Sequence, residues 1–190
     1  MSLSPSAPPP LSADWRRPLW LALLIAASIV FSLGLACAAP LAAFAALAAL
    51  SLPRREALWF VGAVWLANQA VGYACLGYPM TANSLAWGVA IGAAAGLATL
   101  AALAVAPRLA GTSPILGLAS VFLAAFVVDQ AAMLAAAVGG LGGVADVSPT
   151  IIGEVFAINL LAFVGLLAVN WLGAAIGLAG GRARPLSLAG

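Results

Sequence analysis

The positively charged residues of this chain stand only beside or between its long apolar stretches. All seven are arginines. They occur at Arg16, Arg17, Arg54, Arg55, Arg108, Arg182 and Arg184. The three alternate connections, near residues 36–40, 76–83 and 141–150, contain no basic residue. Because short arginine-rich connections stay on the cytoplasmic side during insertion, the pattern predicts six membrane spans with both termini inside.

The amino-acid composition is typical of a membrane protein. Hydrophobic residues make up 65% of the 190 residues and charged residues 6%, whereas a soluble domain carries about 25% charged residues. The predicted fold class is therefore all-α, a polytopic membrane protein. The net charge of +2 comes from arginines that the topology already explains, so it does not indicate a nucleic-acid partner.

A bilayer core needs about 20 apolar residues per helix, and proline and glycine mark the joints between the apolar stretches. We expect spans at 19–35, 40–52, 56–76, 83–106, 114–138 and 151–179. They form a transmembrane domain of residues 18–180, between a Pro- and Ser-rich disordered N-terminus at 1–17 and a cytoplasmic tail at 181–190. The second span is short, so residues 18–52 form either two spans or a re-entrant hairpin. The apolar run after Arg17 is long for a signal peptide, which favours an uncleaved first span.

Polar side chains gather in the outer half of the predicted bundle. At about 1.5 Å per residue, the amides near positions 68, 69 and 159 and the carboxyl at 129 lie at similar depth on three spans. Polar groups in hydrocarbon are costly unless they are paired or hydrated. We therefore predict an outward-facing pocket. Its predicted wall is Trp65, Asn68, Gln69, Trp87, Asp129 and Asn159.

Each of these residues also has a packing interpretation. The amides are compatible with interhelical hydrogen bonds worth about 0.6 kcal/mol each, and Asn170 is a polar residue of the inner half. Asp129 has no arginine at its depth, so it is either protonated or hydrated, and an ionisable group there is a functional hypothesis. The chain has no histidine, which excludes a Ser-His or Cys-His nucleophile and argues against a zinc-type site. We therefore do not expect an enzyme.

Two series of small residues predict close helix packing. Ala22 and Ala26 stand four residues apart in the first span, and Gly88, Gly92 and Gly96 form a ridge in the fourth.

About 190 residues, six spans, cytoplasmic termini and an outward pocket resemble the substrate-binding S-components of energy-coupling factor transporters. The chain is most similar to the cobalamin-specific BtuM family of Gram-negative bacteria, which implies the bacterial cytoplasmic (inner) membrane. In that family a cysteine near the outer end of the third span ligates cobalt and assists removal of its cyanide ligand. Cys75 stands at that place, and Ala22 and Ala26 match the seam that docks an energy-coupling module. The departures are the short second span and the absence of a histidine for the second axial position.

The resemblance implies cobalamin as a transported ligand, with no intrinsic cofactor, and lipid and a coupling module as partners. Independently, a thiolate is a soft ligand suited to a late transition metal. A disulfide between Cys37 and Cys75 is the alternative that sequence leaves open. The predicted ligand-binding residues are Trp65, Asn68, Gln69, Tyr73, Tyr78, Asn83, Trp87, Asp129 and Asn159, with Cys75 on the metal.

Two other function classes remain open. One is an ion- or proton-linked permease that uses Asp129 as its relay. The other is a non-transporting membrane subunit whose polar groups serve only packing.

Overall fold

The computed structural model describes residues 15–35, 39–109, 113–144 and 148–175. These residues form a helical bundle without a strand in any described range, which confirms the predicted all-α class. The helices are α1 (Arg16–Leu35), α2 (Leu41–Ser51), α3 (Arg54–Ala74), α4 (Ala82–Val105), α5 (Pro114–Ala136) and α6 (Pro149–Ala175), with short helical turns η1 (Ala106–Leu109) and η2 (Ala137–Leu141). The predicted tail at 181–190 and most of the predicted N-terminal segment lie outside the described residues.

Local sequence signals set the helix ends. Pro114 occupies the first turn of α5, where its missing N–H is not needed. The Thr81 side chain caps α4 by accepting from the Ser84 N–H at 3.2 Å. The glycines that follow α5 end it with a wider turn, in which Gly140 has a φ of 114°, a conformation that favours glycine.

Three helical segments are long and apolar enough to cross a membrane, as expected of a membrane protein: Ala82–Arg108, Pro114–Leu141 and Pro149–Ala175. Helices α1 and α3 have 20 and 21 residues, so each is about 30 Å long. With only 11 residues, α2 is about 16 Å long, about half of a hydrocarbon core. The structure thus confirms that the second apolar helix is short, as predicted for residues 40–52.

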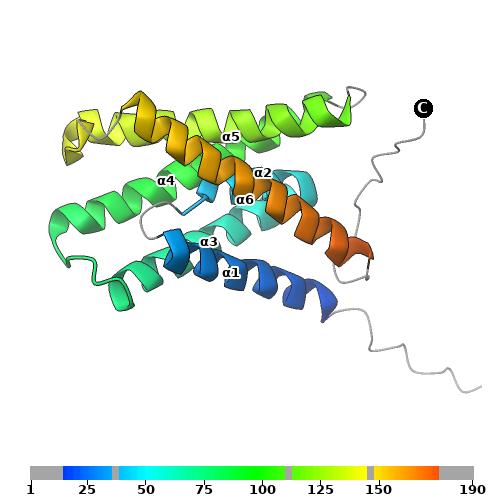
Figure 1. Cartoon of the computed structure of the whole chain (residues 1–190), viewed down its shortest axis with the longest axis horizontal. Helices are drawn as coiled ribbons and strands as arrows, with labels where there is room; N and C mark the ends of the chain where they lie inside the picture. Colours follow the sequence, from blue (N-terminus) through cyan, green and yellow to red (C-terminus); the bar gives the residue numbers. More distant parts are fainter. Residues whose placement is uncertain (1–14, 36–38, 110–112, 145–147, 176–190) are drawn as a thin grey trace, which may run out of the picture.

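Helix α2 lies inside the bundle. Its residues from Leu41 to Ala48 are all buried, and it packs against α3, α4, α5 and α6. A helix that is apolar on every side belongs in a protein interior, and α2 consists almost wholly of alanine, leucine and phenylalanine. In Figure 1, α6 crosses diagonally in front of α2. Helix α2 is thus a core helix.

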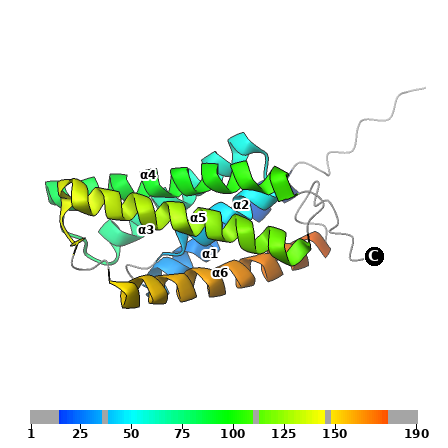
Figure 2. The same cartoon turned by 90° about the horizontal axis from the view of Figure 1, so that it is seen from above.

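The arginines of the described residues gather at one end of the bundle. The starts of α1 and α3 and the end of α4 share the right-hand end in Figure 1. Arg17 and Glu56 form an ion pair there between α1 and α3. The opposite end, here named the far end, holds the end of α3, the start of α4 and η2 (Figures 1 and 2). The arginines that flank alternate apolar stretches in the sequence thus lie together at one end of the bundle, as far as the described residues show.

Aromatic side chains fix α6 onto the bundle. The rings of Phe122 on α5 and Phe163 on α6 stack with their centroids 5.1 Å apart. Phe126 and Phe156 meet edge to face at the same centroid distance. Such pairs add about 0.5–1.5 kcal/mol each beyond their buried area, so this cluster holds α6 where its far-end half contacts α5.

Candidate functional site

Helices α3 and α4 meet through three large side chains that rest on three small residues. The Trp65 indole lies against Gly92, where a Cβ atom would stand 2.6 Å from the ring, and its Nε1 donates to the Gly88 carbonyl at 2.9 Å. One turn further along α3, Gln69 lies against Gly88, whose Cβ would stand 2.7 Å from Oε1. Two residues of the predicted glycine ridge, Gly88 and Gly92, therefore pack within the chain against α3, whereas a Cβ at Gly96 would meet nothing within 4 Å.

The contacts between α3 and α4 continue toward the far end with a pair of hydroxyl groups. Tyr73 Oη and Ser84 Oγ lie 3.2 Å apart, one on each helix. The Tyr73 and Tyr78 rings meet edge to face at 5.9 Å. Tyr78 is brought there by Gly77, whose φ of 69° turns the chain back over α3. The Tyr78 ring then covers Gly72, where any Cβ would collide with it.

Cys75 is an exposed free cysteine at the last turn of α3. Its backbone N–H donates to the Val71 carbonyl at 2.9 Å, so the backbone is anchored while the thiol faces outward from the fold. Cys37, the other half of the alternative disulfide, lies outside the described residues. No group of three or more His, Cys, Asp or Glu side chains that could hold a metal occurs in the described ranges.

Trp87 and Asn83 occupy the first turns of α4. Trp87 Nε1 donates to the Leu141 carbonyl at 3.3 Å, so this side chain connects α4 to the end of η2. Asn83 is exposed. These two residues therefore lie at the far end, and the Trp87 indole is directed to η2.

Asp129 and Gln130 form a neighbouring pair on α5. Gln130 Nε2 donates to Asp129 Oδ2 at 3.1 Å. No hydrogen bond within the described part of the chain joins Asp129 to α3 or α4. Since the ion pair found among those residues is Arg17–Glu56, Asp129 also has no cationic partner there.

Asn159 has a structural role that its sequence position did not reveal. Its Oδ1 accepts from the Ala43 N–H at 3.2 Å, and its Nδ2 donates to the Val155 carbonyl at 3.0 Å. The first N–H groups of a helix have no partner within the helix, so Asn159 caps α2 from α6. Asn159 is ten residues into α6, so the start of α2 lies about 15 Å along that helix. Helix α2 therefore begins deep in the bundle.

Asn68 is buried at 8% exposure, and it accepts from Gln69 Nε2 at 3.4 Å. The predicted site residues are distributed over α3 with its following turn, α4, α5 and α6. Trp65, Asn68, Gln69, Tyr73, Tyr78 and Cys75 form one continuous stretch along α3 and its following turn, which we name the α3 stretch. Within the described residues, no hydrogen bond joins that stretch to Asp129 or Asn159.

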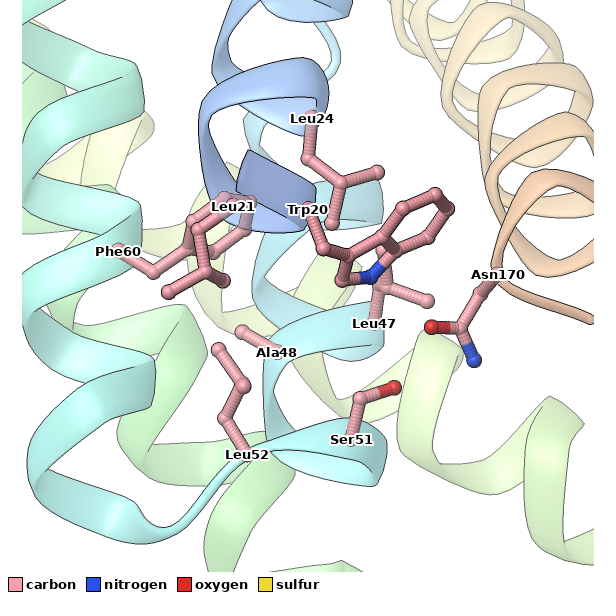
Figure 3. A pocket seen from close by; sticks show the side chains of 9 residues that line it. All are labelled: Trp20, Leu21, Leu24, Leu47, Ala48, Ser51, Leu52, Phe60 and Asn170. Atoms are coloured by element: carbon pink, nitrogen blue, oxygen red, sulfur yellow. The ribbon is translucent and has the colours of Figure 1, made fainter. Parts of the chain in front are cut away.

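Two hollows lie elsewhere. A cavity of about 10 Å³, room for about one water molecule, lies among α1, α2, α3 and α6. The Trp20 indole, the Ser51 hydroxyl and the Asn170 amide surround it (Figure 3). A second hollow of about 380 Å³, here named the α3–α4 groove, is lined by Leu58, Val61, Gly62, Trp65, Val89, Gly92, Ala93 and Gly96. Asn170, the polar residue noted in the inner half of the predicted bundle, lines the smaller cavity.

Comparisons of this chain with protein-family models, with curated proteins and with solved structures find no match. The chemistry of the described residues is therefore the basis for a functional assignment.

Proposed function

We propose that this chain is a six-helix uptake protein of the bacterial inner membrane that binds cobalamin at the far end of the bundle. In this proposal the Cys75 sulfur takes one axial position on cobalt. The observation that carries it is the exposed, free thiol of Cys75 at the end of α3, within three residues along the chain of both Tyr73 and Tyr78, whose rings pair. The resemblance to S-components gives the substrate class.

The lone thiol suits this ligand. A metal bound only by protein needs several side-chain ligands, and no such group occurs in the described residues. The cobalt of a corrinoid already has its four equatorial positions filled by the ring, so a single soft sulfur is sufficient to ligate it. The tyrosine pair offers aromatic area against the ring, as ligand pockets commonly do.

The membrane orientation belongs to the same proposal. It places the far end outside and the arginine end inside, in accord with the arginine rule. Met80 is 77% exposed in the α3–α4 connection, and Arg108 is exposed at the other end. In a cysteine-free background, Met80→Cys should react with an impermeant maleimide in intact cells, while Arg108→Cys should not. The reverse pattern refutes the orientation.

The binding experiment uses the purified full-length protein in detergent with cyanocobalamin. Gel filtration with absorbance at visible wavelengths should show the corrinoid eluting with the protein. Free corrinoid eluting only at its own volume, from a correctly folded sample, refutes the proposal.

Docking of an energy-coupling module is tested separately. Ala22 and Ala26 are exposed on α1, so the face is accessible. Ala26→Leu should lower uptake without lowering cobalamin affinity, because bulk at a small-residue seam separates partner helices. Unchanged uptake with unchanged affinity shows a transporter that works alone.

A second candidate function rests on Asp129, whose carboxylate has no cationic partner in the described residues. It is an ion- or proton-linked permease. Uptake that collapses when the membrane potential or pH gradient is removed, and that is lost in Asp129→Asn, favours this candidate over the first.

A further inference from the structure

The α3–α4 groove is hollow because two of its lining residues have no side chain. Positions 62 on α3 and 96 on α4 are glycines, and a Cβ atom added at either would meet nothing within 4 Å. The lining is otherwise apolar, with Leu58, Val89 and Trp65 on its walls. Val89 is 67% exposed, so the groove opens on the outside of the bundle. In a membrane protein that surface faces lipid.

Three exposed arginines lie beyond the end of this groove that Leu58 and Gly96 form. Arg54 and Arg55 begin α3, and Arg108 follows α4. The two helices are antiparallel, because Trp65 pairs with Gly88 while Tyr73 pairs with Ser84. The start of α3 is therefore level with the last turns of α4. By residue count, Arg108 lies within about two turns of Arg54 along the bundle axis.

The groove leads away from these cations along a single helix face. Arg55, Leu58, Gly62 and Trp65 follow the i, i+3, i+7 and i+10 spacing that keeps residues on one side of a helix. Glu56, the neighbouring carboxylate, is already paired with Arg17. Arg54, Arg55 and Arg108 belong to no ion pair within the described residues.

We propose that the α3–α4 groove binds an anionic glycerophospholipid, with its phosphate against Arg54, Arg55 and Arg108 and one acyl chain in the groove. An apolar groove that ends in unpaired cations matches an acyl chain that ends in an anionic headgroup. Basic residues at a membrane surface attract such lipids, and arginine binds phosphate in a bidentate manner.

The charges favour a lipid over a second copy of the chain. Two copies related by a two-fold axis along the membrane normal would have their arginine ends at the same level. Docking groove to groove would therefore bring the two sets of arginines close together, and like charges across an interface are unfavourable.

Native mass spectrometry of the full-length protein tests the proposal, with dioleoyl phosphatidylglycerol and dioleoyl phosphatidylcholine as probes. The wild type should retain one phosphatidylglycerol more tightly than phosphatidylcholine. Arg55→Gln and Arg108→Gln should each weaken phosphatidylglycerol retention by about fivefold and leave phosphatidylcholine unchanged. Gly96→Leu fills the groove and should weaken both lipids.

Gly165→Leu is the matched control, because Gly165 is exposed on α6 and also has nothing within 4 Å of an added Cβ. It should retain both lipids as the wild type does. If Gly96→Leu does not fold, Gly62→Leu fills the same groove from α3. Equal retention of both lipids by the wild type, or unchanged retention in the arginine and groove variants, overturns the proposal. A dimer in the spectrum that Gly96→Leu dissociates also overturns it in favour of a second copy.

Discussion

Gly92→Ala is the sharpest test of how α3 and α4 fit together. The added Cβ would stand 2.6 Å from Trp65 Cε2 and 2.9 Å from its Cδ2 and Nε1. Carbon atoms prefer separations of about 3.5–4.0 Å, so the indole must move by about 1 Å. That movement also strains the Trp65 Nε1 bond to the Gly88 carbonyl, now 2.9 Å.

The expected magnitude follows from these contacts. Overpacking of this kind costs about 1–3 kcal/mol, and the lost hydrogen bond adds about 0.5–1.5 kcal/mol. The better helix propensity of alanine offsets about 1 kcal/mol. Gly92→Ala should therefore lower the free energy of unfolding by about 0.5–3.5 kcal/mol. Gly96→Ala, one turn away with open space at its Cβ, should be neutral or slightly stabilising.

The assay is thermal unfolding in a mild detergent, followed by circular dichroism of the helices. A domain of this size loses about 2–4 °C in Tm for each kcal/mol. Gly92→Ala should melt clearly below Gly96→Ala. Combining Gly92→Ala with Trp65→Phe should recover part of the loss, because the smaller ring leaves room for the methyl group. Equal Tm values for the two alanine variants would refute the interlock of Trp65 with Gly92.

Three further outcomes follow from single contacts. Asn159→Leu should lower the free energy of unfolding by about 0.5–1.5 kcal/mol, measured by the same melting assay, because the Ala43 N–H keeps only its bond to the Pro40 carbonyl; an unchanged Tm would exclude the capping role. Cys75 in the folded protein should react with a maleimide as fast as a small thiol within about tenfold, since it is exposed; a reaction seen only after denaturation would contradict this. Arg17→Gln, combined with Glu56→Gln in a double-mutant cycle, should give a coupling of at most about 1 kcal/mol that shrinks in high salt, because both side chains are 42% exposed; a larger, salt-independent coupling would show a desolvated pair.

Local sequence patterns were sufficient to predict the helices and to predict that the arginines gather at one end of the bundle. The apolar runs, the glycines after α5 and Pro114 at the start of α5 are signals within a few residues of the feature they predict. The short second apolar run was also visible, but its burial inside the bundle depends on four other helices. Length alone could not distinguish a core helix from a re-entrant one.

Contacts between residues that are far apart in the sequence could not be predicted from local sequence patterns. The bond that Asn159 Oδ1 accepts from the Ala43 N–H, 116 residues earlier in the chain, is one such contact. Helical spacing placed Trp65 and Gln69 on one face correctly, and a glycine ridge was recognised on α4. That the ridge accepts those same two side chains depends on the register between α3 and α4, which no local pattern encodes. The same applies to Trp87, whose indole donates to η2.

The visible absorption spectrum of cobalamin bound to the purified protein tests the central proposal most directly. Wild type and Cys37→Ser should give the same shifted spectrum, because sulfur occupies an axial position on cobalt in both. Cys75→Ser is nearly isosteric and should keep the melting temperature of the wild type while losing the shift. Identical spectra for wild type and Cys75→Ser, or no bound cobalamin in either, would contradict the assignment of Cys75 as the cobalt ligand.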